Sequence, residues 1–430
     1  MKDKSFAEKS VDPVNKSVVV GLDIGTTKIA CFVGVKNEHG KIEIISQGKS
    51  ESLGVKKGVV FNIDKTIKSI KAAIEDTARN CPDGDLNLKN VVVGIAGQHI
   101  KSMQTNDSYT RQNRQDTISK EDIAAFVNEI HDMVMPAGEE IITVIPQEFK
   151  VGDEHGIKDP VGMAGARLEA NFHIITGQVS NVANIYNCVR RAGLEISEVI
   201  LEPIASAEAV LSEEEKEAGI VLVDIGGGTT DVAIFHDGII RHTAVIPFGG
   251  NIITQDIRTG CRILERHAEK LKVKFGSALA SESSEKEVVC IPGLRGQKSK
   301  EITVRNLASI IEARMVEIIE KVNNEVQNSG YAKEIIGGIV ITGGGSKLKH
   351  LTQLFEYLTG MDARIGYPNE HLANTNDESL TSPIFSTGIG LMLKGFEKNA
   401  RVVEPVAEEE VKKGKFFETV LRGVENLFKD

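Results

Sequence analysis

The sequence predicts an α/β fold in which two similar domains follow one another along the chain. Three observations support this prediction. An apolar strand that ends in aspartate, then a glycine turn, paired threonines and a second strand, occurs around Asp23 and again around Asp224. The two copies lie about 200 residues apart, the spacing expected of duplicated domains. A third glycine-rich turn, at Gly343, also follows an apolar strand.

Each hairpin has the composition of a phosphate-binding loop. Apolar runs on both sides of the turn predict strands, at 18–30 and at 220–235. Glycines let backbone N–H groups approach an anion, and threonine hydroxyls add donors. Asp224, at its strand end, could hold a hydrated Mg²⁺ beside phosphates. One such hairpin could be an ordinary β-turn, but two copies of the same order predict a paired phosphate clamp.

The third glycine stretch follows the apolar strand predicted at 338–342. Its glycines are expected to open an amphipathic helix that carries Leu348, Leu351, Leu354, Phe355 and Leu358. Bare glycines at a helix N-terminus let a flat ring or a phosphate approach the backbone. A plain strand–helix turn is the alternative for this stretch alone.

Composition limits the class of protein. The chain has 430 residues, enough for two or more domains, and a formal net charge of −10, which argues against a general nucleic-acid binder. The five cysteines form no C-x-x-C pair, which indicates neither a metal site nor a disulfide framework. Residues 1–16 lack the apolar core of a signal peptide, and no run of about 18 apolar residues exists. We therefore expect a cytoplasmic protein.

Between the glycine turns, helical periodicity predicts helices at 62–80, 119–133, 181–192, 265–274 and 307–326, and another that opens after Phe248. Residues 90–177 read as a self-contained unit with strands at 90–100, 140–151 and 166–177 and one helix, which Ser119 caps. Residues 105–116 are expected to be a polar, mobile connection, and 278–300 an irregular surface insertion. Glu202-Pro203 is expected at a strand–helix junction, because proline suits the first helical turn.

The C-terminal residues have a separate character. A charged linker is expected at 397–414 and an amphipathic helix at 415–430. Docking of this helix on the globular part is one alternative, and an interfacial membrane anchor is the one favoured by its basic, aromatic-rich composition. One copy should bind weakly, and several on one filament should bind by avidity. The apolar face consists of Phe416, Phe417, Val420, Leu421, Val424, Leu427 and Phe428.

With these motifs the chain resembles the actin-like ATPase superfamily, and within it the FtsA family of bacterial cell-division proteins. The resemblance rests on the glycine turns, on Val144-Ile-Pro-Gln-Glu148, on Arg241-His-Thr-Ala-Val-Ile-Pro247 and on the C-terminal helix. It implies actin-like duplicated ribonuclease-H-type domains with an inserted strand–helix–strand–strand subdomain. The implied ranges are a disordered 1–14, domain 1A at 15–89, 178–218 and 383–396, subdomain 1C at 90–177, domain 2A at 219–248 and 305–382, and subdomain 2B at 249–304.

The resemblance also implies a function and site residues. Such a protein binds ATP with Mg²⁺, polymerises with itself on the cytoplasmic face of the inner membrane at the septum, binds the C-terminal tail of FtsZ through its second domain, and recruits later divisome membrane proteins to an anionic membrane surface. By matching positions, phosphates would lie among Gly25, Thr26, Thr27, Lys28, Gly226, Gly227, Gly228, Thr229 and Thr230. Asp23 and Asp224 would organise Mg²⁺ through water. Glu269, Lys272, Gly343, Gly344, Gly345 and Ser346 would border adenosine and ribose.

Two roles for Glu202 leave hydrolysis open. Glu202-Pro203 resembles the Glu-Pro of other bacterial actins, which implies that Glu202 orients the attacking water. The alternative is an ordinary carboxylate at a helix end. Three other classes share the fold: a small-molecule kinase, a DnaK-type chaperone and a pilus-assembly protein of the PilM type. No segment stands out as a sugar pocket, only a short tail follows residue 396, and a pilus protein is not expected to end in an amphipathic helix.

Overall fold

The computed structural model describes residues 18–37, 39–81, 88–111, 116–291, 298–369, 371–373 and 380–402. The chain divides into two compact units, 1–395 and 396–430, and the first contains the sheets and the glycine turns. The N-terminal segment 1–14 and the C-terminal helix expected at 415–430 lie outside the described residues. Helix α10 (Ser386–Val402) covers the first residues of the expected linker, so 397–402 are helical and the prediction there was wrong.

Two five-stranded sheets with the same strand order form the centre of the first unit. In each sheet, three successive antiparallel strands are extended on one side by two parallel strands. This shared order confirms the predicted duplication. The first sheet is β11(Glu195–Leu201)-β6(Asn90–Ile95)-β1(Val18–Ile24)-β2(Lys28–Lys36)-β3(Ile42–Glu51). The second is β14(Ile239–Ile246)-β13(Thr230–His236)-β12(Ile220–Ile225)-β17(Ile339–Thr342)-β18(Ala363–Ile365).

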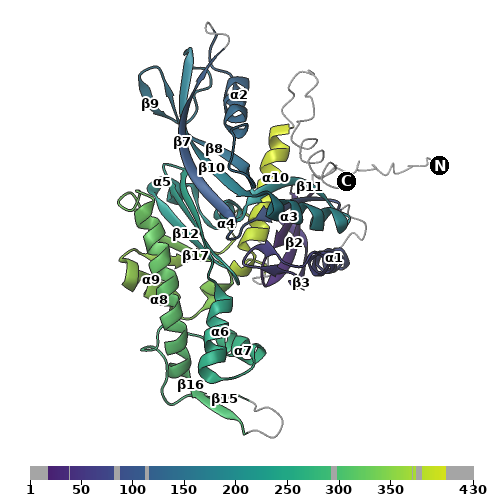
Figure 1. Cartoon of the computed structure of the whole chain (residues 1–430), viewed down its shortest axis with the longest axis vertical. Coiled ribbons are helices and arrows are strands. Elements are labelled where there is room, and N and C mark those ends of the chain that lie inside the picture. Colours follow the sequence, from purple (N-terminus) through teal and green to yellow (C-terminus); the bar gives the residue numbers. More distant parts are fainter. Residues whose placement is uncertain are drawn as a thin grey trace, which may run out of the picture. The chain divides into compact units, whose positions relative to one another are not determined.

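Helices cover the sheets and bury their apolar faces (Figure 1). The Asn62 side chain accepts a hydrogen bond from the Lys65 N–H and so caps α1 (Ile63–Arg79). Thr303 caps α8 (Val304–Asn328) in the same way. Further helices on the sheets are α3 (Val179–Arg191), α4 (Glu202–Val210), α5 (Glu213–Ala218), α9 (Leu351–Thr359) and the first part of α10. Separate clusters of buried side chains form beneath the two sheets, as expected of two domains.

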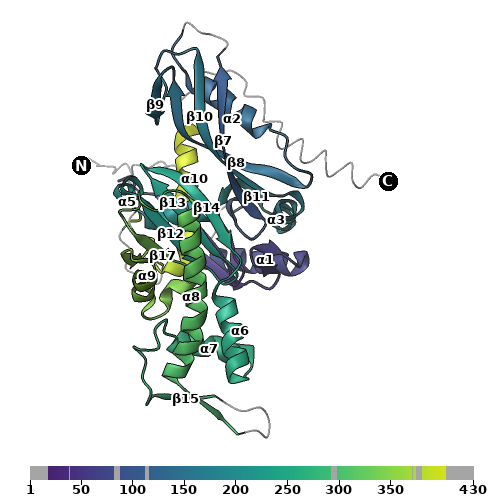
Figure 2. The same ribbon diagram turned by 60° about the vertical axis from the view of Figure 1, so that its left-hand side comes forward.

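The inserted subdomain is a four-stranded sheet, in the order β7-β10-β8-β9, with a helix packed against it (Figure 2). Its own core contains Phe126 and Phe172, whose rings meet edge to face. Ser119 and Asp122 form the expected capping box. The elements are β7 (Ile100–Thr110), α2 (Lys120–His131), β8 (Glu139–Val151), β9 (Glu154–Ile157) and β10 (Arg167–Gln178).

Two predictions for this region were wrong. The strand expected at 90–100 is divided, because β6 pairs with β1 and β11 in the first sheet and β7 begins at Ile100. Residues 90–95 therefore belong to the first sheet and not to the inserted one. The connection expected at 105–116 is strand as far as Thr110, because β7 continues to that residue and pairs with β10 along its whole length.

Beyond the second sheet, α6 (Gly250–Cys261) and α7 (Glu265–Phe275) pack against α8. Part of the expected irregular insertion is strand, since β15 (Val288–Ile291) pairs with β16 (Lys300–Thr303). The third glycine stretch forms a 3₁₀ turn, η1 (Gly344–Lys347), and α9 starts only at Leu351, so these glycines do not open an α-helix. Two short elements complete the unit: the hairpin β4 (Val55–Lys56) with β5 (Val59–Val60), and η2 (Pro383–Phe385).

Candidate functional site

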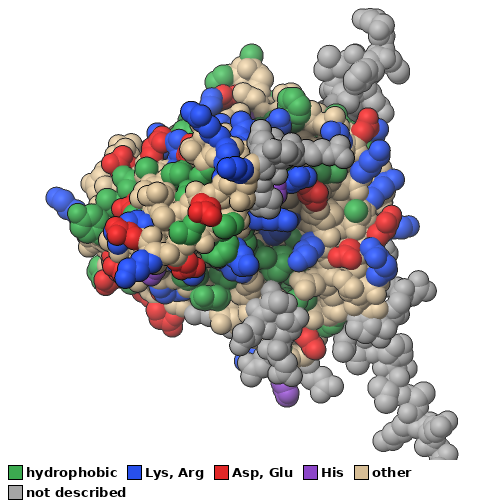
Figure 3. Space-filling view, turned by 90° about the horizontal axis from the view of Figure 1, so that it is seen from below, with side chains coloured by type: hydrophobic (Ala, Val, Ile, Leu, Met, Phe, Trp, Pro, Cys, Tyr) green, Lys and Arg blue, Asp and Glu red, His purple; other side chains and the backbone are tan. Residues whose placement is uncertain are grey.

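A cavity of about 530 Å³ lies between the two sheets where their central hairpins turn. Basic side chains surround a hollow in the face of the molecule seen in Figure 3. Both predicted hairpins and the third glycine turn contribute to the cavity wall. From the first domain the lining residues are Asp23, Ile24, Gly25, Thr26, Thr27, Lys28, Gly58, Ala96 and Glu202. From the rest of the chain they include Asp224, Gly226, Gly227, Gly228, Thr229, Asp231, Gly250, Asn251, Glu269, Lys272, Gly343, Gly344, Gly345 and Thr387.

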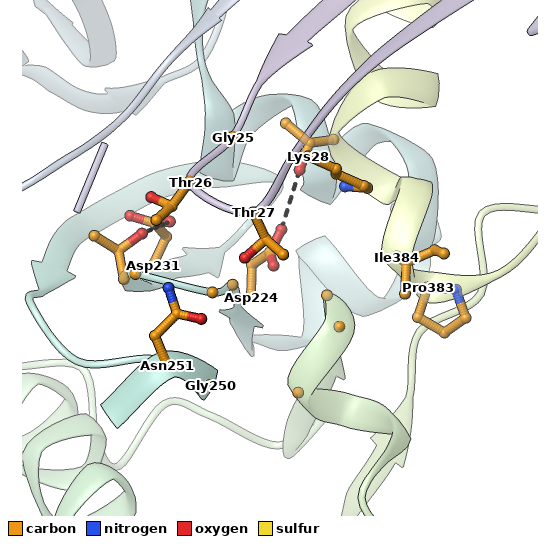
Figure 4. Close-up of a pocket in the computed structure, with 18 of the residues that line it drawn as sticks. Gly25, Thr26, Thr27, Lys28, Asp224, Asp231, Gly250, Asn251, Pro383 and Ile384 are labelled. Carbon is orange, nitrogen blue, oxygen red and sulfur yellow. Dashed lines mark hydrogen bonds between the residues drawn. The ribbon is translucent and has the colours of Figure 1, made fainter. Parts of the chain in front are cut away.

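The two hairpin turns face each other in close contact. A Cβ added at Gly227 would lie 1.9 Å from Thr27 Oγ1, and one added at Gly228 would lie 2.6 Å from Thr26 Oγ1. Only glycine fits at these two positions, because any side chain would collide with the opposite threonine. Figure 4 shows the two threonines pointing across toward the second hairpin. The duplicated motif thus forms one site rather than two separate turns.

Carboxylates are concentrated on one wall of the cavity. Asp23, Asp224 and Asp231 are 4, 8 and 5% exposed, and Glu202 lies beside them at the start of α4. Asp224 Oδ2 accepts hydrogen bonds from Ser206 Oγ at 2.7 Å and from Thr387 Oγ1 at 3.3 Å. These two donors hold the carboxylate in one orientation.

Burial shifts the protonation of these acids. It raises the pKa of Asp231 to about 8, with the neighbouring Asp224 charge as the second cause. Desolvation raises the pKa of Asp224, against the hydrogen bond from Ser206. The pKa of Glu202 is raised well above its usual value by desolvation and then by Asp23. A cation bound here would favour the ionised carboxylates.

Two lysines supply positive charge on opposite sides of the cavity. Lys28 Nζ lies 3.3 Å from Asp23 Oδ2 within the first hairpin. Lys272 Nζ lies 2.8 Å from Glu269 Oε2 and donates to the Gly250 carbonyl at 2.8 Å. Both ammonium groups can therefore reach an anion that enters between the hairpins.

The N-terminus of α6 forms a further part of the wall. The N–H groups of Gly250 and Asn251 donate to the carbonyls of Gly226 and Gly227, at 2.9 and 2.8 Å. These bonds hold the start of the helix against the second hairpin, and Asn251 lines the cavity (Figure 4). The positive end of the helix dipole makes this position favourable for negative charge.

The far side of the cavity is less polar. Val273, Leu348, Pro383 and Ile384 line it near the third glycine turn. Gly343 adopts a φ of +79°, and a Cβ added there would lie 2.2 Å from Asp224 Oδ1. A flat apolar ring fits the chemistry of this side, and a polyanion fits the other.

The structure brings together all but two of the candidate cavity residues. Thr230 Oγ1 donates to the Phe248 carbonyl, and Ser346 Oγ donates to the Gly343 carbonyl at 2.7 Å, so both hydroxyls are engaged within the fold and neither lines the cavity. Sequence reasoning missed Asp231, Asn251 and Thr387. Asp231 had a signal, since it pairs with Asp224 across the hairpin. The seven membrane-helix candidates lie outside the described residues.

The donor set suits a hydrated metal ion rather than a directly bound one. Among the residues that the structure describes, no three His, Cys, Asp or Glu side chains form a group that could hold a metal ion. Asp231 Oδ1 is buried without a hydrogen-bond partner, and Asp23 and Asp224 line the same cavity. Mg²⁺ usually keeps several waters and accepts few protein ligands, so these carboxylates fit Mg²⁺ held through its waters.

Two family models match the chain. The model "Cell division protein FtsA" matches residues 221–390, and "SHS2 domain inserted in FTSA" matches residues 97–176. The chain is 38% identical to the cell division protein FtsA of Pseudomonas aeruginosa over 383 residues, which is 89% of this chain and 90% of that protein. It is 32% identical to the FtsA of Escherichia coli K12 over 396 residues, covering 90% and 93%.

Solved structures of other proteins share the fold. A PilM–PilN type IV pilus biogenesis complex aligns with a TM-score of 0.64 at 17% identity, covering 88% of this chain and 98% of that chain. MreB5 of Spiroplasma citri bound to ADP aligns with a TM-score of 0.54 at 16% identity, covering 89% and 98%. At these identities the likeness establishes an actin-like fold and nothing further.

Proposed function

We propose a function from the premise that the chain belongs to the FtsA family of cell division proteins, which its curated relatives establish. The proposal is that the chain binds Mg-ATP between its two domains, assembles with copies of itself on the cytoplasmic face of the inner membrane, and there tethers FtsZ and recruits later divisome membrane proteins. The observation that carries the nucleotide part is the contact of the two threonine-bearing hairpins around one acidic, glycine-walled cavity.

In this proposal the two hairpins hold the phosphates from opposite sides. Gly25, Thr26, Thr27 and Lys28 would act from the first domain, and the turn from Gly226 to Thr229 from the second. Both turns offer backbone N–H groups and hydroxyls, which suit phosphate oxygens. Thr230 would contribute by fixing the turn from behind, through its bond to the Phe248 carbonyl.

Asp23, Asp224 and Asp231 would hold Mg²⁺ through water, and the ion would neutralise phosphate charge. Ser206 and Thr387 would orient Asp224 toward that position, since both donate to its Oδ2. Glu202 lines the same wall and is suited to orient a water molecule at the terminal phosphate. Slow hydrolysis or none is compatible with its raised pKa, because a protonated carboxyl is a poor base.

Adenosine would lie at the less polar side. Gly343, Gly344 and Gly345 leave room for a ring beside backbone, while Ser346 would only brace that turn. Glu269 and Lys272, which line the cavity, would meet the ribose. Two of the solved structures with this fold, both of MreB5, are described as bound to ADP and to AMPPNP, which supports a nucleotide as the ligand.

Nucleotide binding is tested by titrating a fluorescent N-methylanthraniloyl-ATP into the full chain with Mg²⁺ and then with EDTA. Asp224→Ala should weaken Mg²⁺-dependent binding about 10- to 100-fold, the loss expected when a charged hydrogen-bonding group is removed. Asp153→Ala, at an exposed turn of the inserted subdomain, is the matched control and should bind as the wild type does. Equal affinity of the two variants would refute the assignment of Asp224.

The membrane part of the proposal is tested by co-sedimentation with vesicles that contain an anionic lipid. The full chain should pellet with the vesicles, and a chain ending at Asn399 should stay in the supernatant. Phe417→Glu places a charge on the apolar face and should release the protein, whereas Glu418→Gln changes the polar face and should not. Equal pelleting of full and shortened chains would remove the anchor.

The partner is tested with a synthetic peptide of the FtsZ C-terminal tail, labelled and titrated against the shortened chain. Saturable binding supports the tether. A scrambled peptide of the same composition that binds equally well would overturn it.

A further inference from the structure

Two segments that the nucleotide site does not use meet at one interface. Val144–Glu148 lies on β8 of the inserted subdomain, and Arg241–Pro247 begins on β14 of the second domain. Gln147 Nε2 donates to the Ile240 carbonyl at 2.7 Å, and Arg241 Nη2 lies 2.5 Å from Glu148 Oε1. Figure 2 shows β7, β8 and β14 side by side at this place.

The neighbouring strands of the insert extend the same contact along β14. From β7, Ser102 Oγ donates to the Thr243 carbonyl at 2.7 Å, and Gln104 Nε2 donates to the Arg241 carbonyl at 2.6 Å. From β10, His173 Nε2 lies 3.0 Å from Thr243 Oγ1. β14 is the edge strand of its sheet, so these side chains take hydrogen-bonding positions along an open edge.

This contact is polar and made by side chains. Apart from the Arg241–Glu148 ion pair, its hydrogen bonds are between neutral groups. Such bonds stabilise a fold only modestly, because water replaces them when they break. The main apolar cores of the insert and of the second domain are separate clusters. Val245 of β14 packs against the cluster of the first domain, which also contains Ile100 and Ile175 of the insert, so release of the insert from β14 disturbs that margin and leaves the two main cores intact.

The contact bridges the two domains that enclose the cavity. The insert is covalently part of the first domain, since it lies between β6 and α3, while β14 belongs to the second. Ala96, just before the insert begins, lines the cavity, and Gln98 N–H donates to the Lys57 carbonyl at 3.4 Å. A change in the spacing of the domains must therefore strain or shift the contact at β14.

On the other side, β14 leads directly to the phosphate hairpin. Val245 pairs with Asp231, which lines the cavity. Thr243, which contacts the insert, precedes Val245 by two residues on the same strand. Two strand residues span roughly 7 Å. Beyond Ile246, the chain turns into Gly250, whose N–H bonds to the Gly226 carbonyl. One strand thus touches the insert at one end and the nucleotide hairpin at the other.

We propose that the inserted subdomain reports nucleotide occupancy, through docking of Ser102, Gln104 and Gln147 onto β14 when the hairpins close. This inference rests on the proposed nucleotide site. Closed hairpins and a docked insert occur together in this structure, so a ligand that holds the hairpins together stabilises the docking. By linkage, loss of the docking weakens the ligand by the same factor. The insert is then more exposed to partners in the nucleotide-free protein.

The test combines hydrogen exchange with Mg²⁺-dependent binding of the fluorescent ATP to the full chain. Mg-ATP should slow amide exchange in peptides from 100–104 and 239–246 of the wild type. The double variant Gln104→Ala/Gln147→Ala should lose this protection and bind Mg-ATP about tenfold more weakly, within the usual range of such couplings. Asn106→Ala is the matched control, because Asn106 lies on the same β7 but bonds to Asn171 inside the insert.

The outcomes separate this inference from the site on which it rests. Wild-type binding with unchanged exchange at β7 and β14, and equal affinity of the double variant, overturns the coupling and leaves the nucleotide site intact. No binding by the wild type overturns both. A double variant that loses protection in the core strands β10 and β12 as well as at β14 has lost its fold. In that case Thr243→Val, which removes only the hydroxyl that bonds to His173, takes its place. This variant must also bind Mg-ATP more weakly than the wild type for the coupling to stand.

Discussion

His173 should make the inserted subdomain sensitive to acid. Its ring is 1% exposed, Nε2 bonds to Thr243 Oγ1, and Nδ1 has no hydrogen-bond partner. Burial, and then the nearby His242, lowers the pKa of His173 from 6.5 to about 4. His242 itself lies 3.1 Å from Glu325 Oε2 on α8. The docked structure therefore disfavours protonated His173.

The sign and size of the effect depend on the two pKa values. Between pH 6.5 and 4 the opened state binds a proton at His173 and the docked state does not, so stability falls as pH is lowered through this window. From pH 7.5 to 5.0 the single group removes about 2 kcal/mol of stability. Above pH 7 its effect is small, because both states are then neutral.

Native-state hydrogen exchange of peptides from 100–104 and 239–246, the two strands that meet in the docked structure, measures this opening at pH 7.5 and 5.0, after correction for intrinsic exchange. Wild type should lose about 2 kcal/mol more opening free energy than His173→Gln, which cannot titrate. His155→Gln, an exposed histidine on β9, should behave as the wild type. If His173→Gln loses as much as the wild type does, the buried neutral histidine is not the cause.

Three further predictions concern the cavity and the insert. Gly343→Ala places a Cβ 2.2 Å from Asp224 Oδ1 at a φ of +79°, so thermal unfolding should show a loss of about 1–3 kcal/mol and titration a loss of Mg-ATP affinity; unchanged values would contradict the geometry. Asp231→Asn should weaken ATP binding with Mg²⁺ and not with EDTA, and a loss in both conditions would argue against a metal role for this carboxylate. Phe172→Ala should cost about 3–5 kcal/mol in the insert core, seen as fast exchange across β7 to β10; protection equal to wild type would contradict the packing.

The duplicated hairpins were predictable because their chemistry is local. Each strand, turn and threonine pair occupies about a dozen consecutive residues, and the same order occurs twice. Asp231 was within reach of the same reasoning. In a hairpin, residues directly opposite point to the same face, and the register Asp224 with Asp231 places both carboxylates on the cavity side.

Other site residues had no local signal. Thr387 reaches Asp224 from the start of α10, more than a hundred residues away, and only the packed fold brings the two together. Asn251 gains its place from the α6 N-terminus bonding to the second hairpin. The second half of β7, residues 105–110, was mistaken for a connection because its side chains are polar. Asn106 Nδ2 donates to Asn171 Oδ1 and Arg167 Nη2 donates to Ser108 Oγ, so these polar side chains bond to the neighbouring strand β10.

The acidic cavity wall gives the closed arrangement a reason to depend on its ligand. Buried carboxylates with raised pKa values oppose closure when no cation is present, because burial and mutual repulsion disfavour their charged forms. Lys28 offsets part of this charge, through Asp23, but leaves Asp231 Oδ1 without a partner. A hydrated cation, held there by the phosphates that it binds, would supply the missing positive charge between the two hairpins. Domain closure, and with it the docking of the insert on β14, is then favoured by the ligand rather than by the fold alone.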